Sequence, residues 1–454
     1  MFTLVKHVAF YGIYIATWVI LLLSITGRVR YGLYFLIPLL PLQNIMMKLR
    51  YFPLGKDLND ILLIGMIIGW LMYSHSKGKP IAEKSLFNKL LFFYLIFTYF
   101  ALWRGSSFLG LSAPVSVFDP RVQNWKNYII LPLLFILTLN NIKDKKEMKM
   151  LFVIMCLSMF LMNFYTIRQV GWLTAWWNRF KITGTFYWLG PNEIAAFYAT
   201  YTFVLIGLLL LIKDKRWKII LGILIFQNIY CDLFLFSRGA YLATVVGLFL
   251  IGILRSRKLL PIVVVMLIFW NVLLPSDVIQ RIEVSTEEKT GEMDGSASKR
   301  LEYWQESIEY FKSSPVVGIG FNTVGWLGSK RDTHNLYLRT LAEEGIIGLS
   351  FLLLIMGLAF KRSLLLFRKA DDKFLKGLGL GFCACVAAVM VGNLFGDRWT
   401  YLPLGAYFWV FLGMVERGNL ITSSENKAVV DVSNGVNDYK AKIDRIYGKK
   451  RRKH

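Results

Sequence analysis

One pattern runs through the sequence from end to end: blocks of roughly 15 to 20 apolar residues alternate with short polar loops. A helix of that length spans the hydrocarbon core of a bilayer. One such block would also suit a buried helix of a soluble protein, but twelve or thirteen in series do not. Because the chain is also 56% hydrophobic, we expect an all-α integral membrane protein with about 12 to 13 transmembrane helices.

The apolar blocks and the polar stretches between them divide the chain. The predicted crossings are residues 8–26, 32–47, 60–73, 88–103, 128–141, 150–168, 193–212, 217–236, 239–254, 259–274, 346–360, 376–394 and 401–415. Four regions follow from this pattern: an N-terminal transmembrane region (1–274), a large loop with short helices (275–345), C-terminal transmembrane helices (346–415) and a basic tail (416–454).

The charge distribution predicts the topology. A net charge of +24 would suggest nucleic acid as the partner of a soluble protein. Here the lysines and arginines gather in loops between apolar blocks, which is the positive-inside pattern, so we expect cytoplasmic loops and no nucleic-acid partner. The strongly basic loops are residues 143–146, 213–216, 255–258 and 361–376. Residues 275–345 then form a large extracytoplasmic loop.

The two ends of the chain are harder to place. Thirteen full crossings with a cytoplasmic C-terminus would put the N-terminus outside, against the basic residues of the early loops. One segment before residue 90 is therefore expected to be re-entrant. The tail from residue 416 is too polar to bury a core, ends in a basic run and is predicted to be disordered and cytoplasmic.

Several absences narrow the chemistry. No group of His, Cys, Asp and Glu has metal-ligand spacing, and neither a phosphate-binding Gly-rich loop nor a Gly-x-Ser-x-Gly elbow is present. We therefore expect no metal and no cofactor. Helix capping accounts for Asp57 and Asp60, while Asp119 is a weaker acid or base candidate. The cysteines, all inside apolar blocks, are Cys156, Cys231, Cys383 and Cys385.

The large loop contains a predicted amphipathic helix over residues 299–312. Ser298 is expected to cap this helix and Pro315 to end it. Its apolar face would pack on the membrane domain or lie in the membrane interface. The apolar residues at helical spacing are Leu301, Trp304, Ile308 and Phe311.

His334 is the candidate for catalysis, since it is the histidine of the large loop. Thr333 is expected to cap a helix that begins at His334 and runs into the segment from Ile346. In a first turn the helix dipole disfavours the imidazolium, so a neutral His334 suits a general base. An isolated loop histidine also often has a structural role or is merely solvated.

Arg238 is the second candidate, because it lies between two apolar blocks with almost no loop between them. An arginine at this depth either snorkels to the head groups or has a binding partner. Its planar guanidinium suits the phosphate oxygens of a diphosphate-linked lipid. Arg300, and secondarily Arg331 and Arg398, could add charge to the same pocket or lie at the surface.

Residues 333–349, Thr-His-Asn-Leu-Tyr-Leu-Arg-Thr-Leu-Ala-Glu-Glu-Gly-Ile-Ile-Gly-Leu, closely resemble the signature of the bacterial O-antigen ligase and polymerase family. The resemblance covers roughly residues 185–360, and the N-terminal third matches only as a hydrophobic pattern. Other motifs that match in order and spacing are Gly190-Pro191-Asn192, Ser237-Arg238-Gly239-Ala240, Arg300-Leu301-Glu302-Tyr303-Trp304 and Pro315 to Phe321.

The resemblance implies a GT-C-like membrane glycosyltransferase at the periplasmic face of the bacterial inner membrane. Such an enzyme moves a glycan from undecaprenyl diphosphate to a hydroxyl of lipid A core or a similar acceptor, with inversion and without a metal. By the same resemblance, Arg238 and Arg300 would bind the diphosphate and His334 would deprotonate the acceptor. Further candidates for substrate binding are Arg331, Asn335, Asn192 and Arg398.

The motifs of the family overlap between activities. We favour a ligase slightly, with a polymerase of O-antigen or exopolysaccharide repeat units as the alternative. A flippase for lipid-linked glycans is the alternative from another class. The single histidine of the large loop and the lack of internal repeats argue against a flippase.

Overall fold

The computed structural model describes residues 2–78, 80–173, 175–283, 295–327 and 333–450, and over these ranges it is helical without strands. The predicted all-helical class is thereby confirmed. The first helices are α1 (Phe2–Ile25), α2 (Val29–Leu39), α3 (Gln43–Leu49), α4 (Leu58–Ser76), α5 (Leu86–Phe108), α6 (Pro120–Asn141), α7 (Lys145–Val170) and the 3-10 helix η1 (Trp176–Lys181). The remaining ones are α8 (Pro191–Leu209), α9 (Lys215–Phe234), α10 (Arg238–Leu254), α11 (Leu259–Ile268), α12 (Trp270–Leu273), α13 (Ser276–Glu283), α14 (Gly295–Ser313), the 3-10 helix η2 (Val324–Trp326), α15 (Leu336–Lys369), α16 (Lys373–Gly392) and α17 (Leu402–Lys450).

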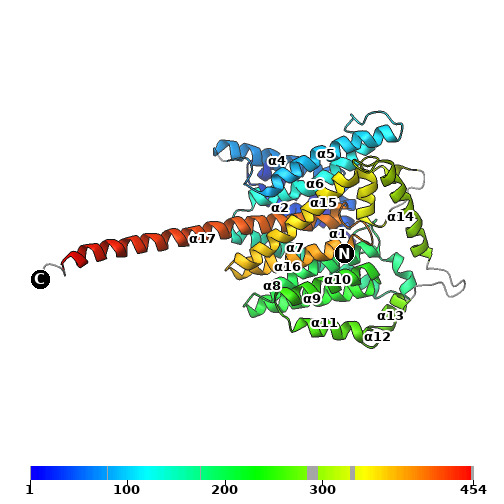
Figure 1. Cartoon of the computed structure of the whole chain (residues 1–454). Coiled ribbons are helices and arrows are strands. Elements are labelled where there is room, and N and C mark those ends of the chain that lie inside the picture. The colour runs from blue at the N-terminus through cyan, green and yellow to red at the C-terminus, as the bar shows by residue number, and fades with distance from the viewer. Residues whose placement is uncertain (1, 79, 174, 284–294, 328–332, 451–454) are drawn as a thin grey trace.

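The long helices lie side by side in one bundle, with α13 and α14 across one end and α17 projecting from the other (Figure 1). We call the first the loop end. The opposite one, which holds the loops of residues 143–146, 213–216 and 255–258, is the basic end. Within the bundle, α8 and α16 are the most buried spans, at 78% each, whereas α9 is 28% buried and faces outward.

Among the described residues, seven helices are long and apolar enough to span a membrane, or up to eight if the bent pair α2 and α3 forms one span. The integral membrane class is confirmed, and the total of 12 to 13 crossings stays a prediction. The pair α2 and α3 bends by 108° and has Pro38 inside α2. This broken pair occupies the early region where we expected a re-entrant segment.

Close packing of α8 on α16 holds the middle of the bundle. A Cβ atom on Gly207 would lie 2.4 Å from the backbone nitrogen of Gly381, so the two backbones touch where side chains would keep them apart. This contact fixes the relative position of the N-terminal end of α8 and the C-terminal end of α16, which both reach the loop end.

The large loop is anchored to α15 by backbone pairing. Ile319 N and Gly320 N donate to the carbonyl oxygens of Ala342 and Glu343, at 2.9 and 2.8 Å. This pairing coincides with a kink at Gly345, whose φ of 66° lies in the left-handed region that glycine tolerates best. The kink falls at the predicted boundary between the loop and the membrane segment at residue 345.

Two predicted boundaries are wrong. Helix α14 begins at Gly295, so Ser298 lies in its first turn rather than before it. Helix α17 continues as far as Lys450, although the sequence predicted disorder from residue 416. The first residues of that tail are held because Glu416 is 2% exposed and forms an ion pair with Arg362.

Candidate functional site

A pocket at the loop end collects five arginines from five separate segments. We call it the arginine pocket. The described residues that line it include no carboxylate: Arg179, Asn192, Ala196, Ser237, Arg238, Gly239, Ala240, Arg281, Arg300, Gly392, Phe395 and Arg398. Five guanidinium groups around one space create a strongly positive field that favours an anion with several oxygens.

Arg179, in η1, is the most buried of these arginines, with 4% of its surface exposed. Its Nη1 donates to Asn192 Oδ1 at 3.0 Å and to the carbonyl oxygens of Leu235 and Phe236 at 3.2 and 2.8 Å. Burial, followed by the positive charge of Arg281, lowers the pKa of Arg179 to about 10. An anion in the pocket would therefore stabilise the charged form of Arg179.

The tight turn between α9 and α10 organises this side of the pocket. Phe236 has a φ of 54°, and Arg238 is the first residue of α10. The carbonyl oxygen of Phe236 accepts from Arg179 and, at 3.4 Å, from Nε of Arg281, which lies in α13. The guanidinium of Arg281 also packs over the ring of Trp176 at 5.2 Å. The turn therefore positions arginines from three segments.

The opposite wall comes from α8 and the segment after α16. Asn192 lies in the first turn of α8, and Glu193 beside it forms an ion pair with Arg398. The backbone nitrogen of Arg398 donates to Asn393 Oδ1 at 2.8 Å. Asn192 and Arg398 thus face the same pocket from elements far apart in sequence.

Helix α14 connects the arginine pocket to His334. Arg300 lines the pocket, and one turn later Trp304 Nε1 donates to the carbonyl oxygen of Thr333 at 3.0 Å. Leu336 N, two residues after His334, donates to the carbonyl oxygen of Asn393 at 2.9 Å. These two hydrogen bonds fix the chain around His334 between α14 and the end of α16.

The predicted cap of α15 is wrong in position. The helix begins at Leu336, and its N-cap is Asn335, whose Oδ1 accepts from the backbone nitrogens of Tyr337 and Leu338. His334 precedes the cap and has a φ of 50°. The prediction that His334 lies in the first turn is therefore wrong, because Asn335 caps the helix one residue later.

A second cavity, of about 560 Å³, has Leu336 in its lining, two residues after His334. We call it the aromatic cavity, because rings of Tyr128, Trp188, Trp399 and Tyr401 line it. Its polar lining includes Gln43, Asp57, Asp60, Gln123, Asn124, Asn127, Asn322, Arg339, Glu343 and Glu344. Aromatic faces among amides and carboxylates suit a ligand with both C–H faces and hydroxyl groups.

Arg339 organises the floor of the aromatic cavity. Its guanidinium donates to Asp397 Oδ2 at 2.8 Å, to Asn322 Oδ1 at 2.7 Å and to Glu343 Oε2 at 3.2 Å. Asp397 precedes Arg398, so the short segment after α16 supplies side chains to both cavities.

Of the residues singled out in the sequence, Arg238, Arg300, Asn192 and Arg398 come together in the arginine pocket. Arg331 lies outside the described residues. Over the described ranges no group of three or more metal-ligand side chains gathers in one place.

Sequence reasoning missed Arg179 and Arg281. The weak signal available was the aromatic setting of Arg179, within Trp176-Trp177-Asn178-Arg179-Phe180. Arg281 has no comparable local signal, since its place in the pocket depends on the α9–α10 turn.

Comparison with known proteins gives a match to part of the chain. A search of curated proteins found no match to the chain. Residues 223–353 match the family model described as O-antigen ligase. The matched stretch includes Arg238, Arg281, Arg300 and His334, whereas Arg179 and Arg398 lie outside it. The chain is therefore similar to the O-antigen ligase family over residues 223–353.

Proposed function

We propose that this protein is a membrane glycosyltransferase that moves a glycan from undecaprenyl diphosphate to an acceptor hydroxyl on the periplasmic face of the inner membrane. The observation that carries the proposal is the arginine pocket, held by hydrogen bonds beside the chain around His334. A transfer of this kind needs a site for the leaving diphosphate, a base for the acceptor and room for a sugar, and each has a counterpart at the loop end.

The arginine pocket would bind the diphosphate of the donor. Guanidinium groups bind phosphate oxygens through pairs of charge-assisted hydrogen bonds, and the pocket offers them from five directions. Its cavity volume is about 30 Å³, room for a water molecule, so the donor enters as the arginine side chains move apart. Arg238 and Arg300 are half-buried, whereas Arg179 is 4% exposed, so we expect these two to move more readily than Arg179.

The reaction is a single displacement with inversion at the anomeric carbon. An imidazole nitrogen of His334 takes the proton of the acceptor hydroxyl as the acceptor oxygen bonds to that carbon. The bond from the anomeric carbon to the diphosphate oxygen breaks, and its electron pair leaves with the diphosphate. The arginines offset the charge that develops there, which is the largest contribution expected from such a site.

The aromatic cavity would hold the acceptor sugars. Its volume of about 560 Å³ suits one or a few sugar rings, whose C–H faces pack on aromatic side chains. Leu336, two residues after His334, lines this cavity, so an acceptor there would lie near the chain around His334. We propose that the acceptor oxygen approaches the anomeric carbon opposite the diphosphate, as an in-line displacement requires.

We favour a ligase, which transfers a finished glycan to lipid A core or a similar acceptor. The test uses a deletion strain complemented with wild type, His334→Ala or the control His75→Ala, an exposed histidine at the basic end. We expect His334→Ala to lower transfer at least about 100-fold and His75→Ala to leave it unchanged. Membrane levels of each variant are measured in parallel.

The glycolipids of the deletion strain identify the activity. Long chains that accumulate on undecaprenyl diphosphate indicate a ligase, whereas single repeat units on the final acceptor indicate a polymerase. If His334→Ala restores the wild-type profile, the catalytic role of His334 is wrong. Glycans trapped on the cytoplasmic side would instead support a flippase.

A further inference from the structure

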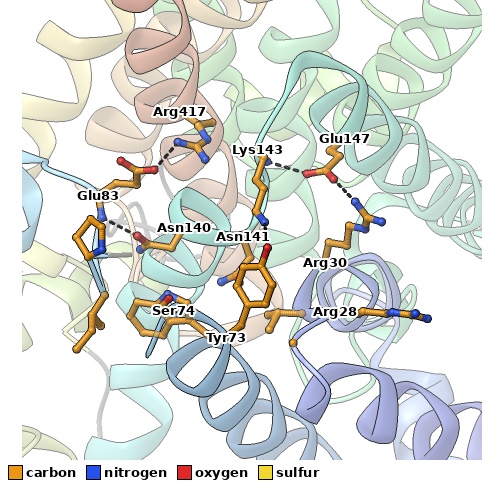
Figure 2. Close-up of a pocket in the computed structure, with 15 residues that line it drawn as sticks. Arg28, Arg30, Tyr73, Ser74, Glu83, Asn140, Asn141, Lys143, Glu147 and Arg417 are labelled. Carbon is orange, nitrogen blue, oxygen red and sulfur yellow. Dashed lines mark hydrogen bonds and ion pairs between the residues drawn. The ribbon is translucent and has the colours of Figure 1, made fainter. Parts of the chain in front are cut away.

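The basic end contains a second polar pocket, which no part of the proposed transfer uses. We call it the basic-end pocket, and its volume is about 350 Å³. It lies where the α1–α2 turn, the C-terminal ends of α4 and α6, and the start of α7 meet (Figure 2). It is therefore separated from the arginine pocket by the length of the bundle (Figure 1).

The basic-end pocket has more cations than carboxylates. Its four cationic residues are Arg28, Arg30, Lys143 and Arg417, against Glu83 and Glu147. Both carboxylates already have partners: Glu83 accepts from Arg417 at 2.9 Å, and Glu147 pairs with Arg30. Over the described part of the chain, Arg28 and Lys143 form no ion pair. Two positive charges thus remain for an anion.

Lys143 points toward the interior of this pocket. Figure 2 shows its side chain reaching from the α6–α7 loop to Tyr73, and its Nζ lies 4.5 Å from the centre of that ring. The same Nζ is 3.4 Å from the Tyr73 hydroxyl. Ser74, 6% exposed, supplies a second hydroxyl in the lining. An ammonium beside hydroxyl groups suits the oxygens of a phosphate group.

The position of the pocket points to a lipid. It opens at the end of α4, one of the candidate spans, and the same helix exposes Ile68, Leu71 and Met72 along its side. Acyl chains could lie against these residues while the head group enters between Trp70 and Ile81. Anionic lipids of the cytoplasmic leaflet carry their phosphate at this depth.

From this geometry we infer that the basic-end pocket binds the phosphate of an anionic phospholipid, held by Lys143 and Arg28. The site is independent of the glycan transfer. The two ion pairs on either side set the shape of the pocket, because they tie Glu83 to α17 and Glu147 to α2. A bound lipid would therefore join α2, α4, α7 and α17 at the cytoplasmic face.

The experiment measures phosphatidylglycerol binding to the full chain by native mass spectrometry, with phosphatidylcholine as the neutral comparison. The test variant is Arg28→Ala/Lys143→Ala, and the matched control is Lys213→Ala/Arg216→Ala. The control removes the same charge from exposed positions of the basic end outside the pocket. Each cation near a lipid phosphate changes affinity roughly five-fold, so we expect the test variant to bind about 25-fold more weakly.

Each outcome decides the inference. If phosphatidylglycerol binding is lost only in the test variant, the site is supported. Equal losses in both variants indicate binding by general surface charge and overturn the inference, and so does no loss in either variant.

Glycerol phosphate is the soluble probe. If it binds wild type as tightly as phosphatidylglycerol does and needs the same two cations, the phosphate site stands and the lipid source is wrong. Arg28 and Lys143 are exposed, so we expect the variant to fold. Lys143→Gln alone repeats the test if it does not.

Discussion

The two ends of the bundle differ in whether carboxylates lie beside their basic side chains. At the basic end, four cations form ion pairs with carboxylates on other segments: Arg30 with Glu147, Arg417 with Glu83, Lys145 with Glu425 and Arg362 with Glu416. At the loop end, five arginines line one pocket whose described lining includes no carboxylate, and Glu193 is paired with Arg398 at its wall.

We interpret the ion pairs as structural and the arginine pocket as the site of the proposed transfer. Ion pairs between helices fix their relative positions, although exposed pairs contribute little to stability. A cluster of like charges has the opposite effect on the empty protein, since the guanidinium groups repel one another. The pKa of Arg179 is lowered first by burial and then by the positive charge of Arg281, which is part of that repulsion. Because we propose that this cluster binds the anionic diphosphate of the donor, substitutions at the two ends should have unequal effects on transfer.

The largest expected effect comes from Arg238→Ala. Loss of one positioned donor to a leaving group typically costs 10² to 10³ in rate, and we expect transfer to fall about 100-fold or more. Arg238→Lys keeps the charge without the planar donor pair and should recover part of this loss. Transfer is measured as product formed in membranes that contain equal amounts of each variant.

The matched control is Arg216→Ala, which removes an exposed arginine at the basic end. Its transfer rate should stay within about two-fold of wild type, since exposed charges away from a site usually matter little. If Arg216→Ala and Arg238→Ala lose activity equally, the contrast between the two ends has no functional meaning.

The sequence predicts most of the helices and part of the arginine pocket. The apolar blocks predict the helices, because their length matches a bilayer. Arg238 stands out locally, since a charge between two apolar blocks calls for a partner. Arg179 does not, because the groups that hold it are the carbonyl oxygens of residues 235 and 236, 56 and 57 positions away. Tertiary structure alone brings these groups together.

The helix start at Asn335 shows a second limit. Threonine, histidine and asparagine stand in a row at 333–335, and any of them can precede a helix. The choice is settled by contacts outside the segment, because Leu336 N donates to Asn393 and Trp304 donates to Thr333. Local pattern therefore predicted the helix and misplaced its first residue by two.

Arg179→Ala should have the next largest effect, on stability and on anion binding together. It removes the donor for Asn192 Oδ1 and two buried carbonyl oxygens, which costs about 1 to 3 kcal/mol. The thermal shift caused by inorganic diphosphate should also shrink, because stabilisation of the folded state by a ligand grows with the logarithm of its affinity. An unchanged diphosphate shift would show that Arg179 only supports the fold.

Trp304→Phe tests the link between the arginine pocket and His334. It removes the hydrogen bond to the Thr333 carbonyl oxygen while it keeps most of the ring. We expect a loss of about 1 kcal/mol in stability and a fall of roughly ten-fold or less in transfer. A positioning role predicts a fall in kcat with KM for the donor unchanged. The control is the neighbouring substitution Tyr303→Phe. If it changes kcat and KM as much as Trp304→Phe does, Trp304 has no specific positioning role.

The smallest expected effect distinguishes capping from substrate binding at Asn335. Asparagine and aspartate cap helices about equally, so Asn335→Asp should keep the stability of wild type, whereas Asn335→Ala should lose about 1 kcal/mol. If Asn335 also bound substrate, an added negative charge near the arginine pocket would weaken donor binding although the cap stays intact. Transfer near the wild-type rate in Asn335→Asp would restrict its role to the cap. It would then leave the arginines, with His334, as the groups that act on the donor and the acceptor.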